Sequence, residues 1–68
     1  MSDKELAIVV HLTKGSTSKE IAYEISLSKA SVDLKIRLLC ERLHARSRAQ
    51  LVAIAIQGGF VSFTYPSM

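Results

Sequence analysis

The sequence predicts an all-α domain of four helices, and three observations support this fold class. Apolar residues recur at the three- and four-residue spacing of helices that pack on a core. Ser2, Thr17 and Ser47 are each followed three residues later by Glu or Gln, the spacing of a capping box at a helix start. Glycines at Gly15 and Gly58 fall where two of these helices would end.

The chain length of 68 residues sets the size of the core. A chain of this size buries only about 60% of its unfolded surface, so its core is marginally stable without a disulfide, a metal or a partner. Cys40 is the single cysteine, which excludes an internal disulfide. Zinc takes four ligands, and Cys40, His44 and His11 are too few, so we expect no metal site and no cofactor. The remaining support would come from a second copy of the chain.

The charge is mildly basic, with a net +3 from nine Lys and Arg against six Asp and Glu. Most of the basic residues lie between residues 29 and 48, which is compatible with a nucleic-acid partner. No apolar run approaches the roughly 18 residues of a membrane span, and MSDKEL lacks the pattern of a signal peptide. We therefore expect a reduced cytoplasmic protein.

The first helix is expected over Asp3–Lys14. Its apolar run from Leu6 to Leu12 is rich in β-branched residues and would also suit a buried strand. The capping box before this run and the glycine after it favour a helix. The second helix is expected over Ser18–Ile25 with Ile21, Ala22 and Ile25 inward, and Leu27 is expected to anchor the turn that follows.

The third helix, within Ser28–His44, has two different faces. Val32, Ile36, Leu39 and Leu43 form one buried stripe, and Ser28 is a suitable N-cap. The opposite face carries Ala30, Leu34, Arg37, Leu38 and Glu41, with Lys29 and Asp33 on one flank and Ser31 and Lys35 on the other. A helix held across a short turn with its outer face free is the helix-turn-helix arrangement, so this helix would enter a DNA groove.

The fourth helix, Arg48–Gln57, is apolar on every side and must be covered on every side. We expect the first and third helices to cover one side. A second subunit, or the tail from Phe60, would cover the rest. The expected dimer residues are Leu51, Ile54 and Ala55, with the two-fold axis near Ile54. The tail alternates polar and apolar residues, so it could form a short strand or dock on the fourth helix.

Motifs along most of the chain are similar to those of one known family. Residues 15–32, GSTSKEIAYEISLSKASV, are similar to the pattern G-x-S-x-K-E-I-A-x-x-L-x-I-S-x-x-T-V. Leu39-x-x-Arg42-Leu43, Arg48 and Gly59-Phe60-Val61 follow in the same register. Over residues 1–61 the sequence therefore resembles the LuxR/GerE-type helix-turn-helix domain of bacterial transcription regulators, with residues 62–68 as a C-terminal tail.

The resemblance implies a recognition helix within Ser28–His44, phosphate contacts from the second helix and Arg48, and dimerisation through the fourth helix. It also implies a sensory second domain in most members, so the chain is either a stand-alone member or a fragment. Asp33 departs from the pattern because the family usually has Lys there. Lys35 replaces a frequent His, and Leu38 and Glu41 stand at positions that are commonly polar or basic.

The candidate DNA-binding residues are each open to more than one interpretation. Lys29, Arg37 and the more lateral Lys35 would contact phosphate or guanine, or belong to a solvated helix face. Leu34 would touch a thymine methyl or, with Leu38, a protein partner, and Asp33 could accept a hydrogen bond from cytosine. The full set is Ser18, Lys19, Ser28, Lys29, Ser31, Asp33, Leu34, Lys35, Arg37 and Arg48.

These observations predict a homodimeric, sequence-specific transcription regulator that binds double-stranded DNA through residues 28–44. The alternative is a protein-interaction module that pairs with and inhibits a larger LuxR-type regulator, or that binds another protein through Leu34 and Leu38. No Ser/His/Asp or Cys/His constellation in the sequence has an orienting partner, and there is no Gly-rich phosphate loop. We therefore do not expect an enzyme.

Overall fold

The computed structural model describes residues 2–59 and has the expected all-α architecture. The helices are α1 (Asp3–Thr13), α2 (Ser18–Glu24), α3 (Lys29–Leu43) and α4 (Arg48–Gln57). Each predicted helix is confirmed to within one residue at either end, and the described residues contain no strand. The two alternatives for the tail, a strand or docking on the fourth helix, lie outside the described residues.

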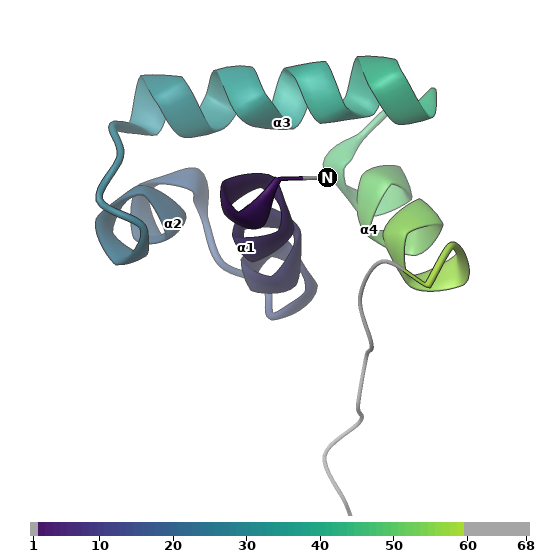
Figure 1. The fold of residues 1–68 in the computed structure, drawn as a ribbon, viewed down its shortest axis with the longest axis horizontal. Coiled ribbons are helices and arrows are strands. Elements are labelled where there is room, and N and C mark those ends of the chain that lie inside the picture. Colours follow the sequence, from purple (N-terminus) through teal and green to yellow (C-terminus); the bar gives the residue numbers. More distant parts are fainter. Residues whose placement is uncertain (1, 60–68) are drawn as a thin grey trace, which may run out of the picture.

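Helix α3 is the element on which the other three are assembled. It lies across one side of the molecule and packs against α1, α2 and α4, while its far side is left uncovered by them (Figure 1). Helix α1 also packs against α4. Helix α3, the second helix of the α2–α3 pair, is therefore held in position by its packing against all three other helices.

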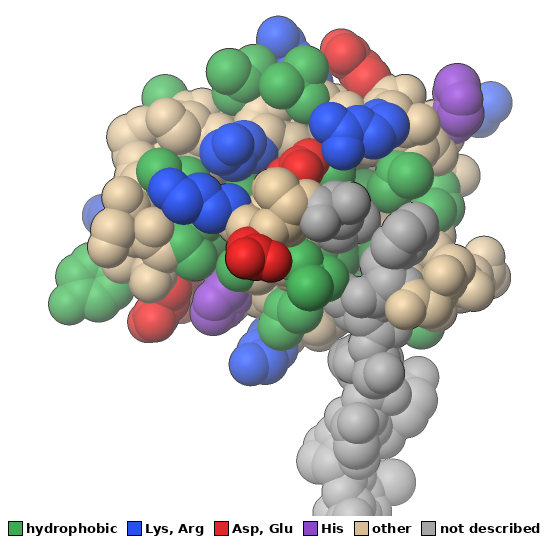
Figure 2. All heavy atoms as spheres, in the orientation of Figure 1, with side chains coloured by type: hydrophobic (Ala, Val, Ile, Leu, Met, Phe, Trp, Pro, Cys, Tyr) green, Lys and Arg blue, Asp and Glu red, His purple; other side chains and the backbone are tan. Residues whose placement is uncertain are grey.

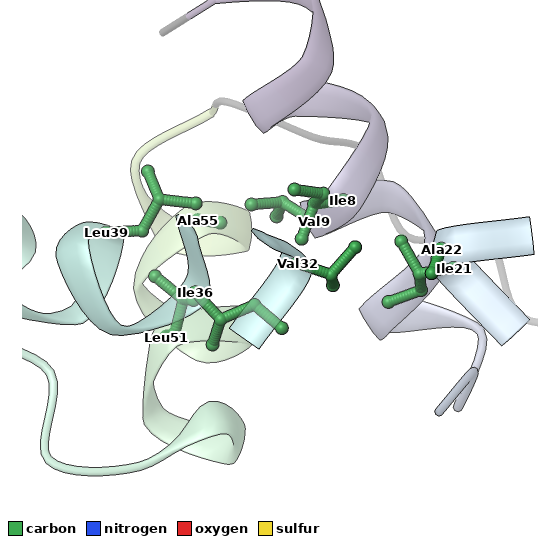
Figure 3. Close-up of a cluster of buried hydrophobic side chains, with 9 residues drawn as sticks. All are labelled: Ile8, Val9, Ile21, Ala22, Val32, Ile36, Leu39, Leu51 and Ala55. Carbon is green, nitrogen blue, oxygen red and sulfur yellow. The ribbon is translucent and has the colours of Figure 1, made fainter. Parts of the chain in front are cut away.

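The core lies between α3 and the three other helices and consists of aliphatic side chains. Nine residues form it: Ile8, Val9, Ile21, Ala22, Val32, Ile36, Leu39, Leu51 and Ala55 (Figure 3). The predicted stripe of α3 is confirmed, because Val32, Ile36 and Leu39 are buried and Leu43 packs against them. Full burial of one such side chain contributes about 1.5–3 kcal/mol.

The predicted capping boxes start α1 and α2. Ser2 Oγ accepts from Glu5 N–H at 3.2 Å, and Glu5 Oε1 accepts from Ser2 N–H at 2.9 Å. Thr17 and Glu20 make the same pair of bonds at 3.2 and 2.8 Å. These bonds satisfy backbone N–H groups that have no partner within the helix.

The start of α4 differs from a full box. Ser47 Oγ accepts from Gln50 N–H at 3.1 Å as expected. The Gln50 side chain, however, accepts from Arg46 N–H instead of Ser47 N–H. Ser47, the cap residue, has an extended backbone, and the N–H of Arg46 makes the reciprocal bond in its place. The helix still begins at Arg48.

The turn between α2 and α3 is held by its own backbone and by Leu27. Ser26 has a positive φ of 59°, and Leu27 N–H donates to Ala22 O at 2.9 Å. Leu27 is half-buried against the core, so its expected anchoring role is confirmed. Ser28 then caps α3 by accepting from Ser31 N–H at 3.1 Å.

One side of α4 is confirmed to face the core, against α1 and α3. Leu51 and Ala55 are fully buried within the single chain. Their side chains are therefore not accessible to a partner subunit, and they are corrected from dimer residues to core residues. Ile54 is half-buried and Ala53 is exposed, so these two remain at the surface of α4.

Candidate nucleic-acid interface

The outer face of α3 is exposed as the sequence predicts. Its members are Ala30, Leu34, Arg37, Leu38 and Glu41, and all five are exposed to solvent. Leu34 and Leu38 retain 48% and 44% of their accessible surface, which is high for leucine. With 15 residues, α3 is roughly 22 Å long, and the major groove of DNA, about 12 Å wide, admits a helix of this kind.

A shallow, open hollow lies on this face. Its volume is about 380 Å³, and its lining residues are Ala30, Asp33, Leu34 and Arg37. Methyl groups, a carboxylate and a guanidinium therefore meet at one place on α3. These groups are suited to a thymine methyl, a cytosine amino group and a guanine edge respectively.

Three of the candidate residues are joined by two ion pairs, one within α3 and one from α3 to α4. Lys29 Nζ lies 2.8 Å from Asp33 Oδ2, one helical turn away on α3. Arg48 Nη2, at the start of α4, lies 2.8 Å from Asp33 Oδ1. Both carboxylate oxygens are thus occupied by cations that were candidates for DNA contacts.

The pKa of Asp33 reflects these contacts. The hydrogen bond from Lys29 lowers this pKa most, and together with Ser18 and Arg48 it brings the value from 3.8 to about 2. Asp33 is therefore ionised at every physiological pH. Its negative charge is a permanent part of the surface of α3.

Ser18 and Lys19 begin α2 but differ in exposure. Lys19 is exposed, whereas the Ser18 side chain is 4% exposed. Burial places the Ser18 hydroxyl close to Asp33, and this oxygen has no hydrogen-bond partner of good geometry within residues 2–59. The Ser18 side chain is therefore buried, and the phosphate contact expected at this helix N-terminus stays a prediction.

The remaining candidates flank the outer face. Ser28 is exposed, while Ser31 and Lys35 are half-buried on the opposite flank from Asp33. The Ser28 hydroxyl donates to Ser31 Oγ at 3.0 Å, so these two hydroxyls are engaged with each other. Lys35 is thus more lateral than Arg37, as expected from the helical spacing.

The surface along α3 is mixed in charge and polarity. Hydrophobic, basic and acidic side chains alternate along the edge where α3 runs, and no continuous basic surface is seen from this side (Figure 2). A second cross-helix ion pair, which the sequence did not reveal, joins Arg42 Nη1 to Glu5 Oε2 at 3.2 Å. It fixes the C-terminal end of α3 to the start of α1.

The described residues offer neither a metal site nor a membrane span. No cluster of three or more His, Cys, Asp or Glu side chains there could hold a metal ion. None of the four helices is long and apolar enough to cross a membrane. The outer face of α3 with its ion-paired flank is therefore the candidate functional site.

Comparison with known proteins gives the family of this site. The model of the family described as "Bacterial regulatory proteins, luxR family" matches residues 1–55, which include α1, α2, α3 and most of α4. The chain belongs to the luxR family. The resemblance noted in the sequence is thereby confirmed.

Two curated relatives extend the comparison. The chain is 31% identical over 62 residues to the "Transcriptional regulatory protein YdfI" of Bacillus subtilis (strain 168), covering 91% of this chain and 29% of the relative. It is 25% identical over 64 residues to the "Glycerol metabolism activator" of Pseudomonas putida, covering 94% and 28%. The chain thus spans less than a third of the curated relatives it matches. No solved structure matches it significantly.

Proposed function

We propose that this luxR-family chain regulates transcription in the cytoplasm by binding double-stranded DNA, with α3 in the major groove. The observation that carries the proposal is the outer face of α3, which the other helices leave uncovered. The turn of residues 25–28 connects α2 to α3, and the two helices pack against each other. Membership of a family of bacterial regulatory proteins and a relative named as a transcriptional regulatory protein support the same function.

The residues of α3 divide between base reading and positioning. Recognition helices contact base edges through their N-terminal part, which here contains Lys29, Ala30 and Leu34, while Arg37 lies just beyond the middle of α3. Arg37 is exposed at the hollow and is assigned to guanine or to phosphate. Leu34 is assigned to a thymine methyl, and exposed Lys19 to phosphate.

The variant Arg37→Ala tests this assignment on a duplex that the wild-type protein selects from random sequence. A base-reading role predicts a loss of about 1–3 kcal/mol in specific binding, measured by fluorescence anisotropy. A phosphate role predicts a uniform loss on all sequences and a salt slope smaller by about one unit. Lys14→Ala removes a positive charge outside α3 and is the control. Unchanged binding of Arg37→Ala to selected and random DNA would contradict the assignment.

We further propose a homodimer through the exposed side of α4, with the two-fold axis near Ile54. The half-buried Ile54 and exposed Ala53 support it, since Leu51 and Ala55 are already used in the core. A two-fold axis would place two copies of α3 about 34 Å apart, one turn of DNA. Ile54→Glu should give monomers with weak DNA binding. The control variant is Gln57→Glu, which adds the same charge at the exposed end of α4. A wild-type monomer at high micromolar concentration by sedimentation would contradict this assembly.

A second candidate function is a protein-interaction module that pairs with a larger LuxR-type regulator or another protein. The exposure of Leu34 and Leu38, one turn apart, favours it specifically. Asp33→Lys, which restores the residue type usual in the family, separates the two functions. Absence of DNA binding in the wild type and its appearance in Asp33→Lys would favour the interaction module.

A further inference from the structure

We propose that Asp33 determines specificity by holding Lys29 and Arg48 away from DNA phosphates, which weakens binding that is independent of sequence. The inference rests on the proposed DNA-binding function. Asp33 is a positioning residue in this role, because it acts through the two cations and not by reading a base.

The geometry of the carboxylate gives the first support. Its two oxygens each hold a different cation at 2.8 Å, one from α3 and one from α4. Distances of this length are typical of charge-assisted hydrogen bonds. Each carboxylate oxygen is therefore already shared with a cation, which leaves a cytosine amino group only the remaining lone pairs.

Charge accounting gives the second support. The chain has nine Lys and Arg residues, and one carboxylate pairs with two of them. A protein that neutralises DNA phosphates gains affinity by releasing counterions, with a slope of about −0.9 in log K against log salt for each phosphate. A DNA phosphate must compete with Asp33 for Lys29 and Arg48, so these cations contribute less to this non-specific term.

The surroundings of the carboxylate give the third support. Side chains from three helices converge on it, namely Ser18 from α2, Lys29 from α3 and Arg48 from α4. The Ser18 hydroxyl is buried and has no hydrogen-bond partner of good geometry among the described residues. The convergence of a hydroxyl and two cations makes this a place for an anionic oxygen, which Asp33 supplies internally. Removing the charge of Asp33 should therefore open the place to a phosphate.

Asp33→Asn is the test variant because it removes the charge with little change in shape. Glu41→Gln is its matched control, since Glu41 is an exposed carboxylate on the same helix and makes no ion pair within residues 2–59. Asp33→Glu keeps the charge and should retain much of the wild-type behaviour. Circular dichroism at 222 nm confirms that each variant is folded.

The first measurement is fluorescence anisotropy with a random-sequence duplex between 50 and 200 mM salt. Two freed cations should make the slope of Asp33→Asn steeper by up to about 1.8, an additional change in affinity of at most roughly 12-fold over this range. Glu41→Gln should leave the slope close to that of the wild type. A slope of Asp33→Asn equal to that of Glu41→Gln would overturn the inference while leaving the proposed function intact.

The second measurement does not require DNA. Titration with inorganic phosphate, followed by the NMR signal of Arg48 Nε–H, should show a saturable shift in Asp33→Asn that is absent from the wild type and from Glu41→Gln. If none of the proteins binds DNA, the proposed function fails and the role of Asp33 in DNA binding fails with it, whereas this titration still shows whether Asp33 keeps an anion from Lys29 and Arg48. The same phosphate response in Asp33→Asn and Glu41→Gln would overturn the inference.

Discussion

Replacing Leu39 with alanine should remove a large part of the free energy of unfolding, whereas the same change at the neighbouring Leu38 should not. Leu39 is 0% exposed in the core, and Leu38 is 44% exposed on the outer face of α3. Truncating a buried leucine to alanine costs about 2–5 kcal/mol, because transfer free energy is lost and a cavity is left. An exposed substitution away from such contacts usually stays within about 0.5 kcal/mol.

The size of the domain makes this difference easy to measure. At roughly 0.05–0.15 kcal/mol per residue, a chain of 68 residues has a free energy of unfolding of about 3–10 kcal/mol. One kcal/mol shifts the Tm of a domain this small by about 4–8 °C, so Leu39→Ala should lower Tm by roughly 8 °C or more. Urea and thermal unfolding followed at 222 nm measure both quantities. Equal losses in Leu38→Ala and Leu39→Ala would refute the assigned faces of α3.

Three further predictions concern the caps and the carboxylates. His44→Gly should raise the free energy of unfolding by about 1 kcal/mol in urea titrations. His44 has a left-handed φ of 57°, a conformation that is unfavourable for a residue with a side chain but not for glycine. No gain in stability would contradict the cap geometry. Thr17→Ala should lower the free energy of unfolding by about 1 kcal/mol through loss of the capping box of α2, and Thr17→Ser should retain most of it. Stability should also fall as pH drops from about 4.5 to 2, because hydrogen bonds from Ser2, Thr17 and Lys29 lower the pKa of Glu5, Glu20 and Asp33 respectively. A carboxyl with a lowered pKa in the folded state stabilises the fold above its ordinary pKa and loses that contribution as pH falls through its folded pKa. A urea midpoint unchanged between pH 5 and pH 2.5 would contradict these assignments.

The helices could be predicted because their signals are local. A capping residue, its partner three positions later and the apolar spacing between two stops lie within one short segment. The helical period alone also places Leu39 on the buried face of the helix and Leu38 on the exposed face. The conformation of His44 had no such signal, because the sequence shows neither Gly nor Asn at that cap.

The site could be predicted less completely because its decisive contacts join different helices. The spacing of Lys29 and Asp33 is that of an ion pair within one helix, and this much is visible in the sequence. The approach of Arg48 to Asp33 depends on the packing of α4 against α3, as does that of Arg42 to Glu5 over 37 residues. Such contacts follow from tertiary packing and not from local spacing.

The structure therefore changes the interpretation of Asp33, the residue that departs from the family pattern. In the sequence, Asp33 is a carboxylate at a position where the family usually has Lys. In the structure, the same carboxylate carries two cations and links the starts of α3 and α4. The expected consequence is weaker non-specific binding with the fold and the groove face of α3 preserved.

The most direct test of the central claim, that α3 binds DNA, is an NMR titration of the ¹⁵N-labelled protein with a short duplex at low salt. The account predicts that the largest amide shifts fall on the N-terminal half of α3 and on the residues that begin α2 and α4, with α1 little changed. The shifts should diminish as salt is added, since phosphate contacts release counterions. Shifts confined to α1, or no shifts at 50 mM salt with protein and duplex at 100 μM, would contradict the claim.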